Sequence, residues 1–210
     1  VKEDVEWHLL SEGLLKSTDE IDELLMKKDG KGLVKLKPDI DTEQRISTSQ
    51  RFARLVVSAC SSPDYRPLSE VIDSLPKLDM TLTVNAKVVS QSVLRLNTIA
   101  EKFRTTGGVH VAALYSTNGE LAALAEDVGR HNAVDKVIGA GATKNMNFRN
   151  FFLVLSGRLT GDIVLKAARM KIPVIASLAA AISSGLEAAT IKTARKTALQ
   201  SGVLRYRIVI

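Results

Sequence analysis

Three glycine-bearing turns are the parts of the sequence best suited to bind an anion. They lie at residues 106–110 (TGGVH), 126–132 (EDVGRHN) and 156–158 (SGR). Glycine lets a backbone approach phosphate oxygens closely, and the N–H groups at a helix start favour anions. Arg130 and Arg158, in two of these turns, can each bind a phosphate through paired hydrogen bonds. One such turn is usually only a turn, but three at corresponding strand ends predict a shared anion pocket.

This predicted pocket has a definite set of residues, and we expect it to bind guanine nucleotides. They are Thr106, Gly107, Gly108, His110, Gly129, Arg130, His131, Asn132, Ser156, Gly157 and Arg158. For His131, a hydrogen bond to Asp127 or Asp135 is as good an interpretation as a ligand contact. A metal site is not expected, because the two histidines and the single cysteine have no zinc-ligand spacing. The paired motifs of a zinc deaminase are absent as well.

Cys60 is the only cysteine of the chain. A lone cysteine is most often a buried, inert thiol. Here it follows an apolar segment, 51–59, that predicts a strand, and it starts the turn-forming sequence CSSPD, so we expect an accessible loop. An accessible thiol becomes a nucleophile when nearby cations or a helix start favour the thiolate. No internal disulfide is possible, which suits a reducing compartment.

The pattern of apolar residues predicts the elements that position these groups. Before the first turn we expect two short helices within 5–28, a strand at 33–36, a loop at 37–50 and a helix at 85–103. An Asn-Gly turn at 118–119 joins segments 109–115 and 121–125 as a β-hairpin. A helix follows at 132–142, and Asn132 with Asp135 resembles a capping box at its start.

The last third of the chain alternates between strand and helix patterns. We predict strands at 151–155, 173–178 and 203–210, and helices at 160–170 and 183–195. Such alternation implies right-handed crossovers in a parallel or mixed sheet. The prediction is therefore an α/β domain over 51–210 with helices on both faces of its sheet and Cys60 at the sheet's edge. Residues 1–50 would form a small helical and extended N-terminal part.

Composition limits the classes of partner. The net charge is +6 with an isoelectric point near 9.5, which fits either a lysine-rich surface or an anionic partner. The basic residues form no tract, which argues against nucleic acid and leaves a phosphate-bearing small molecule open. No apolar run reaches the roughly 18–20 residues that span a bilayer, so no membrane segment is expected. The first residue is Val rather than Met, so we expect the printed sequence to be part of a longer product.

One segment resembles a known family. Residues 126–136, EDVGRHNAVDK, are similar to the most characteristic stretch of the FdhD family. The segments around it fit in the same order: LLSEG at 9–13, TGGVH at 106–110, SGR at 156–158, KAA at 166–168 and IPV at 172–174. The resemblance therefore runs over most of the chain.

The resemblance implies a cytidine-deaminase-like α/β fold without the deaminase zinc site. It implies a cytoplasmic, usually dimeric protein that accepts persulfide sulfur from a cysteine desulfurase. The sulfur would pass to the molybdenum centre of formate dehydrogenase, which is carried by a bis(molybdopterin guanine dinucleotide) cofactor that the protein binds transiently. The family's sulfur-carrying cysteine lies in a Cys-x-x-Cys loop after a strand, which makes Cys60 the candidate here.

Two departures from the family pattern keep an alternative open. Pro63 stands at the second cysteine position, so a two-cysteine relay is impossible. The end of the chain is shorter than the family's basic C-terminal segment, and the resemblance extends cofactor contact onto Val203, Leu204, Arg205, Tyr206 and Arg207. The alternative function is a cofactor-binding chaperone that transfers no sulfur. A nucleic-acid or nucleotide-binding module rests on charge alone.

Overall fold

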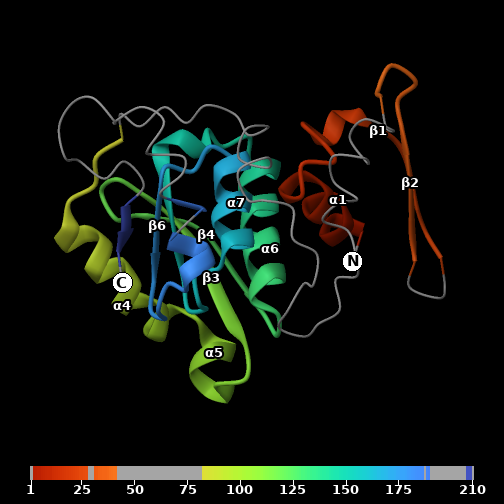
Figure 1. The fold of residues 1–210 in the computed structure, drawn as a ribbon. Helices are drawn as coiled ribbons and strands as arrows, with labels where there is room; N and C mark the ends of the chain where they lie inside the picture. Colours follow the sequence, from red (N-terminus) through yellow and green to blue (C-terminus); the bar gives the residue numbers. More distant parts are fainter. Residues whose placement is uncertain (1, 28–30, 42–81, 187, 190–206, 210) are drawn as a thin grey trace, which may run out of the picture.

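The computed structural model describes residues 2–27, 31–41, 82–186, 188, 189 and 207–209 (Figure 1). Several predicted features lie outside these ranges. They are the strand at 51–59, Cys60 and its loop, and four of the C-terminal residues expected to contact a cofactor, 203–206.

The N-terminal part contains one helix and a two-stranded ribbon. Helix α1 spans Lys2–Ser11, a 3-10 turn η1 spans Thr18–Glu20, and strands β1 (Ile21–Met26) and β2 (Gly32–Leu36) pair antiparallel. The strand predicted at 33–36 is confirmed, but the second helix predicted before residue 28 is wrong. The leucines of this segment lie on opposite faces of β1, with Leu24 buried and Leu25 exposed. The segment forms a strand because its backbone pairs with β2, a contact that local propensity does not record.

The main sheet has five strands in the order β4-β3-β5-β6-β7. Neighbours are antiparallel from β4 to β5 and parallel from β5 to β7, so the predicted mixed sheet is confirmed. The hairpin and the strand–helix alternation are also where the sequence placed them. The strands are β3 (His110–Ser116), β4 (Leu121–Asp127), β5 (Phe151–Leu155), β6 (Val174–Ser177) and β7 (Arg207–Val209).

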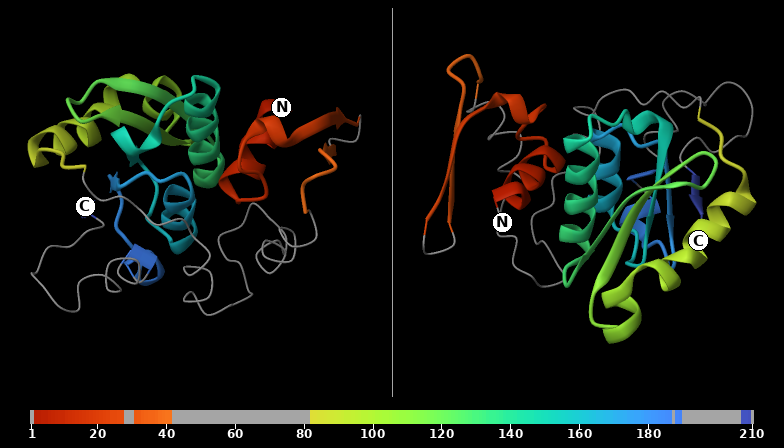
Figure 2. Two further views of the ribbon diagram at one scale, coloured as in Figure 1. Left: turned by 90° about the horizontal axis from the view of Figure 1, so that it is seen from above. Right: turned by 180° about the vertical axis from the view of Figure 1, so that it is seen from behind.

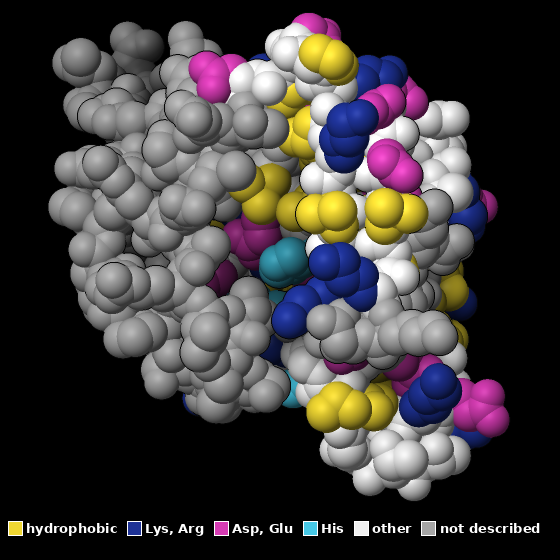
Figure 3. All heavy atoms as spheres, turned by 90° about the vertical axis from the view of Figure 1, so that its right-hand side faces the viewer, with side chains coloured by type: hydrophobic (Ala, Val, Ile, Leu, Met, Phe, Trp, Pro, Cys, Tyr) yellow, Lys and Arg dark blue, Asp and Glu magenta, His cyan; other side chains and the backbone are white. Residues whose placement is uncertain are grey.

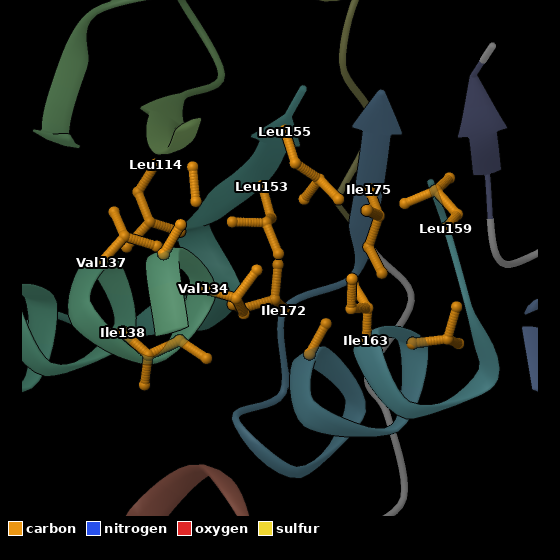
Figure 4. Packing of buried hydrophobic residues seen from close by; sticks show 14 of the residues in the cluster. Leu114, Val134, Val137, Ile138, Leu153, Leu155, Leu159, Ile163, Ile172 and Ile175 are labelled. Carbon is orange, nitrogen blue, oxygen red and sulfur yellow. The ribbon is translucent and has the colours of Figure 1, made fainter. Parts of the chain in front are cut away.

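Helices cover both faces of this sheet (Figures 1 and 2). Alternate residues of β3 divide between the two cores: Leu114 packs with α6 (Arg130–Thr143) and α7 (Gly161–Arg169), whereas Tyr115 packs with α4 (Ala86–Ile99). Figure 4 shows Val134 of α6 and Ile163 of α7 pointing toward Leu153 and Ile175 of the strands, and Val137 of α6 beside Leu114. This two-sided burial holds the ends of β3 to β6 at fixed positions.

Two helices differ from the sequence prediction, one in being divided and the other in where it starts. The helix expected over 85–103 is divided at Ala100 into α4 and α5 (Glu101–Thr106), because the Glu126 carboxylate accepts hydrogen bonds from Phe103 N and Lys102 N, 2.6 and 3.3 Å away. The capping box expected at Asn132 is wrong. Helix α6 starts at Arg130 after Gly129, and Asp135 is buried among other partners.

A short 3-10 turn η2 (Phe148–Asn150), which was not predicted, precedes β5. A further helix begins at Ser183, as expected for the segment 183–195. Among the described residues, no helix is both long enough and apolar enough to cross a membrane.

A buried cluster of charges joins helix α1 to α6 and α7. The Lys166 ammonium of α7, 3% exposed, donates to Asp135 Oδ1 of α6 at 2.8 Å and to Ser11 Oγ of α1 at 2.9 Å, and it pairs with Glu12. His8 Nδ1 lies 3.0 Å from the other Asp135 oxygen. All three donor positions of Lys166 are therefore used, which is the condition under which a buried charge is tolerated.

The two carboxylates of this cluster are held in the ionised form. Burial alone would raise the pKa of Asp135, but hydrogen bonds and charge from His8 and Lys166 outweigh it and lower that pKa. Burial opposes ionisation of Glu12 as well, and Lys166 and Arg169 still lower its pKa. Each carboxylate therefore stabilises the fold above its unfolded pKa, and this contribution is lost as pH falls through the lower, folded pKa.

Close packing of α1 on α6 depends on a glycine. A Cβ atom added to Gly139 would lie 1.9 Å from ring atoms of Trp7. The Trp7 ring therefore rests directly on the α6 backbone, and no larger residue fits there without moving α1.

The first prediction concerns this contact. Gly139→Ala should lower the free energy of unfolding by about 1–3 kcal/mol, because the added methyl group meets the Trp7 ring. In a Trp7→Ala background the same change should instead stabilise by about 0.5–1 kcal/mol, the ordinary gain of alanine over glycine inside a helix. Urea unfolding of the four proteins measures both effects. Equal effects of Gly139→Ala in the two backgrounds would contradict the packing.

The second prediction concerns acid. The wild-type chain should lose stability between about pH 5 and pH 3, as Glu12 and Asp135 take up protons that their folded-state partners disfavour. A double variant, Asp135→Leu with Lys166→Met, should lose less over the same interval, since one carboxylate is gone. Urea midpoints across that range measure the difference. Identical pH profiles would show that Asp135 has an unperturbed pKa.

Candidate functional site

Four strand ends meet at one edge of the main sheet. His110 at the start of β3 is the register partner of Asp127 at the end of β4, and the end of β5, Leu155, pairs with both Ala112 and Ser177. The turns after β4, β5 and β6 and the turn before β3 therefore emerge side by side. In α/β sheets this is where ligands bind.

The second and third predicted turns are in contact through Gly157. A Cβ atom there would lie 3.0 Å from Arg130 Cβ and 3.3 Å from His110 Nδ1. The three residues come from the loop after β5, the start of α6 and the start of β3. The structure thus brings together His110, Arg130 and Gly157, as the sequence predicted, and the absent side chain of Gly157 is what allows their approach.

Two serines fix the loop that carries Gly157. Ser156 Oγ accepts a hydrogen bond from Val111 N at 2.9 Å, and the Ser156 N–H donates to Val111 O at 3.0 Å. Ser177, at the end of β6, donates to Gly157 O at 2.7 Å and accepts from Ala179 N at 3.0 Å. The loop is therefore held from both neighbouring strands, and its geometry does not depend on a ligand.

Asp127 shapes the start of α6. Its Oδ1 accepts from Gly129 N at 2.8 Å and from the Asn132 side-chain amide at 3.1 Å, and Lys136 Nζ lies 2.7 Å from Oδ2. Burial would raise the pKa of this carboxyl, but the hydrogen bonds from Lys136, Gly129 and Asn132 outweigh it and lower the pKa. The N-cap residue, Gly129, supplies no capping side chain. The first turn of α6 therefore keeps backbone donors for an external acceptor.

Arg130 is the residue at this edge whose hydrogen-bonding capacity is not fully used by described residues. Its Nε is buried, and no residue in the described part of the chain is its hydrogen-bond partner. A buried donor without a partner is costly, and a guanidinium group prefers a carboxylate or phosphate. Arg158 is exposed in the adjacent loop and close enough to act on His110. Burial first, and then the charges of Arg130 and Arg158, lower the pKa of His110, which favours its neutral form.

His131 lies on the side of α6 that faces α7. Burial lowers its pKa, with further contributions from Arg130 and Lys166 that Asp162 and Asp135 oppose. The two carboxylates proposed as its hydrogen-bond partners are engaged elsewhere: Asp127 with the start of α6, and Asp135 with His8 and Lys166. His131 thus stands between the turn that carries Arg130 and the buried charge cluster.

The first predicted turn contributes less than the other two. Gly107 ends α5 with φ 60°, and Thr106 Oγ1 accepts from Gly108 N at 3.1 Å while donating to Lys102 O at 2.7 Å. All three residues are exposed, and an added Cβ at Gly107 would meet nothing within 4 Å. They lead into His110 at the correct edge but make no contact with Arg130 or Gly157 that the structure shows.

The backbone of Arg207 lies at the other end of the sheet. It pairs with Val174 at the start of β6, whereas the site follows Ser177 at the end of that strand. The strand itself therefore does not bring residue 207 to the predicted pocket.

Sequence reasoning missed two residues of this site. Asp127 was read only as a partner for His131, and Ser177 was not considered. Both could have been suspected, because Asp127 closely follows the predicted strand at 121–125 and Ser177 lies near the end of the one predicted at 173–178. Within the part of the chain that the structure describes, no group of three or more His, Cys, Asp and Glu side chains could hold a metal ion. On the face shown in Figure 3, basic and acidic side chains are interspersed over the coloured residues.

Comparison with known proteins gives a consistent result. A model of the FdhD/NarQ family matches residues 6–195. A curated protein named sulfur carrier protein FdhD from Methanothermobacter thermautotrophicus is 37% identical over 182 residues, which cover 87% of this chain and 68% of that protein. Its namesake from Sulfurisphaera tokodaii is 33% identical over 189 residues, covering 90% and 70%.

A solved structure agrees with the sequence relatives. It is a crystal structure described as that of a formate dehydrogenase accessory protein from Desulfotalea psychrophila. It is 27% identical, superposes with a TM-score of 0.65, and is matched over 91% of this chain and 70% of that chain. The turns that meet at the sheet edge lie inside the matched range of the family model. The chain belongs to the FdhD/NarQ family.

Proposed function

We propose that this chain is a sulfur carrier that serves formate dehydrogenase and holds the phosphate-bearing part of a molybdenum cofactor while it does so. The curated relatives carry the name sulfur carrier protein, and the similar solved structure is described as a formate dehydrogenase accessory protein. The observation that carries the cofactor part of the proposal is the buried Nε of Arg130, beside Gly157 and His110, which has no hydrogen-bond partner among the described residues.

The residues at the sheet edge suit the bis(molybdopterin guanine dinucleotide) cofactor, which is cargo in this proposal. Its dinucleotide linkages present phosphate oxygens, and Arg130, Arg158 and the backbone donors of the first turn of α6 are the groups that would hold them. Gly157 keeps the space next to Arg130 free of a side chain. No zinc is needed for binding of this kind.

The sulfur would be carried by Cys60, the only thiol of the chain. Its thiolate attacks the outer sulfur of a persulfide on a cysteine desulfurase. A new sulfur–sulfur bond forms at Cys60, the desulfurase's sulfur–sulfur bond breaks, and the desulfurase cysteine leaves as a thiolate, with no external oxidant. Because Pro63 replaces a second loop cysteine, delivery requires direct attack by the acceptor on the Cys60 persulfide. We further propose that the chain works in the cytoplasm as a homodimer.

Pro63 also favours a second candidate function, a chaperone that protects or inserts the cofactor without transferring sulfur. The two functions share the anion site and differ only in the need for Cys60. An experiment on each part therefore separates them.

The third prediction tests the anion site. Arg130→Gln and Arg158→Ala should each weaken GDP binding by about 1.5–3 kcal/mol, as expected for a lost hydrogen bond to a charged group. Gly157→Ala should weaken it as well, because the new methyl group lies 3.0 Å from Arg130 Cβ. Isothermal titration calorimetry measures the affinities.

Arg95→Ala is the matched control for these variants. Arg95 Nη1 lies 3.3 Å from Gly119 O in the hairpin turn, at the opposite edge of the sheet, and its loss changes the net charge by the same amount. GDP affinity should stay at the wild-type value in this variant. Equal losses in Arg95→Ala and Arg158→Ala would attribute binding to overall charge and contradict a specific site.

The fourth prediction tests the sulfur step. After incubation with cysteine and a desulfurase, intact-mass spectrometry should show the wild-type chain gaining one sulfur atom and Cys60→Ser gaining none. In cells without another copy, Cys60→Ser should abolish formate dehydrogenase maturation while GDP binding persists. Full maturation by Cys60→Ser would rule out sulfur carriage and leave the chaperone.

A further inference from the structure

The buried cluster around Lys166 lies directly behind the anion site. Asp135 and Lys166 each follow the first residue of their helix by five positions, Arg130 in α6 and Gly161 in α7. At 1.5 Å per residue, their hydrogen bond sits about 7.5 Å below both helix starts. It therefore joins α6 and α7 at equal depth from the edge where Arg130 and the Gly157 loop meet.

A second pair of residues lies one turn closer to that edge. His131 precedes Asp135 by four residues and Asp162 precedes Lys166 by four, so each shares a helix face with its partner below. Lys166, Asp162 and Asp135 all act on the pKa of His131 after burial and Arg130. The two helices thus face each other through two tiers of charged or titratable groups, and the lower tier is bonded.

Helix α1 completes the lower tier. Lys166 takes two of its three partners, Ser11 and Glu12, from the end of α1. Arg169, the next turn of α7, donates to Ser11 O at 3.1 Å and lies 3.6 Å from Glu12. The end of α1 therefore contacts α7 at both Lys166 and Arg169. These contacts lie next to the Asp135–Lys166 hydrogen bond, which joins α7 to α6.

We propose that Lys166 is a positioning residue of the anion site, and that Ser11 and Glu12 act with it: together with Asp135 they set the spacing between the starts of α6 and α7 and thereby the distance between Arg130 and the Gly157 loop. This proposal deepens the proposed function and rests on it for the nature of the ligand. The groups that contact the ligand and the groups that hold them apart are different residues, so they can be varied separately.

Anion binding needs precise placement of the groups that contact the ligand. Binding groups must be held within about 0.5 Å of their productive geometry by the residues behind them. A loop bonded to two strands and a helix start shaped by Asp127 are each fixed locally, but neither sets the spacing between α6 and α7. The Asp135–Lys166 hydrogen bond, by contrast, joins the two helices directly.

The test removes the bond while keeping the helices packed. In Asp135→Leu/Lys166→Met the buried pair is replaced by apolar side chains of similar size, which is often neutral for stability. Glu12 keeps Arg169, and His8, whose side chain is 39% exposed, can turn to water. GDP and inorganic pyrophosphate affinities, measured well below the melting temperature, should fall by roughly three- to thirtyfold.

A matched control separates positioning from stability. Val89→Ala makes a cavity in the core on the other face of the sheet, which α4 covers. It should lower the melting temperature and leave both affinities unchanged. If Asp135→Leu/Lys166→Met does not fold, Glu12→Gln serves in its place, because it removes one charged partner of Lys166 at a side chain that is 23% exposed.

A measurement without any ligand tells failure of this proposal from failure of the proposed function. In a Cys60→Ser background, nitroxide labels on Val128→Cys and Asp162→Cys, two exposed positions, report the spacing of the starts of α6 and α7 by dipolar broadening. The broadening should decrease or become heterogeneous when the bond is removed. Unchanged broadening in the folded double variant, or unchanged pyrophosphate affinity beside a changed spacing, would overturn the proposal. A changed spacing in a chain that never binds GDP would instead overturn the proposed function.

Discussion

The structure depends on how one buried ammonium group is satisfied. Lys166 lies among the core-facing residues of α7, where an unpaired charge would be prohibitively costly. Its three donors are met by Asp135 on α6 and by Ser11 and Glu12 on α1. Lys166 lies on α7 and its partners lie on α6 and at the end of α1, so the charge is tolerated only when these three helices are assembled. Because the buried Lys166 ammonium needs partners from both other helices, it favours this one arrangement of α1, α6 and α7.

Helix α6 links this cluster to the site. Its first turn presents Arg130 and backbone donors at the sheet edge, and its second turn presents Asp135 to Lys166. Farther along, Gly139 admits the Trp7 ring of α1. Successive turns of this helix thus carry binding, electrostatic and packing roles.

The polar groups at the site differ in whether their hydrogen bonds are made within the protein. Ser156, Ser177 and Asp127 use their hydrogen-bonding capacity within the protein, and each fixes a turn. The Nε of Arg130 lies buried among these satisfied groups, and no described residue is its hydrogen-bond partner. This contrast is why Arg130 carries the proposal for the phosphate-bearing cofactor.

The sequence by itself determined much of the architecture. The Asn-Gly turn, the buried-type strand at 151–155 and the apolar stripe of the helix at 85–103 were sufficient to predict a mixed α/β sheet with helices on both faces, because these signals are local and periodic. The grouping of Arg130 with Gly157 and His110 also followed from the sequence, since strand ends in such a sheet share an edge.

Only the tertiary structure decided what depends on contacts between distant residues. Residues 21–26 form a strand because β2 pairs with them. The helix is divided at Ala100 because Glu126 of β4 accepts hydrogen bonds from the backbone N–H groups of Lys102 and Phe103. Asp135 looked like a capping residue, and it is instead the buried partner of Lys166, 31 positions away. Periodicity records which face of an element is buried, but it does not record which buried polar groups will meet. That is settled when the helices pack and every buried charge must find its partner.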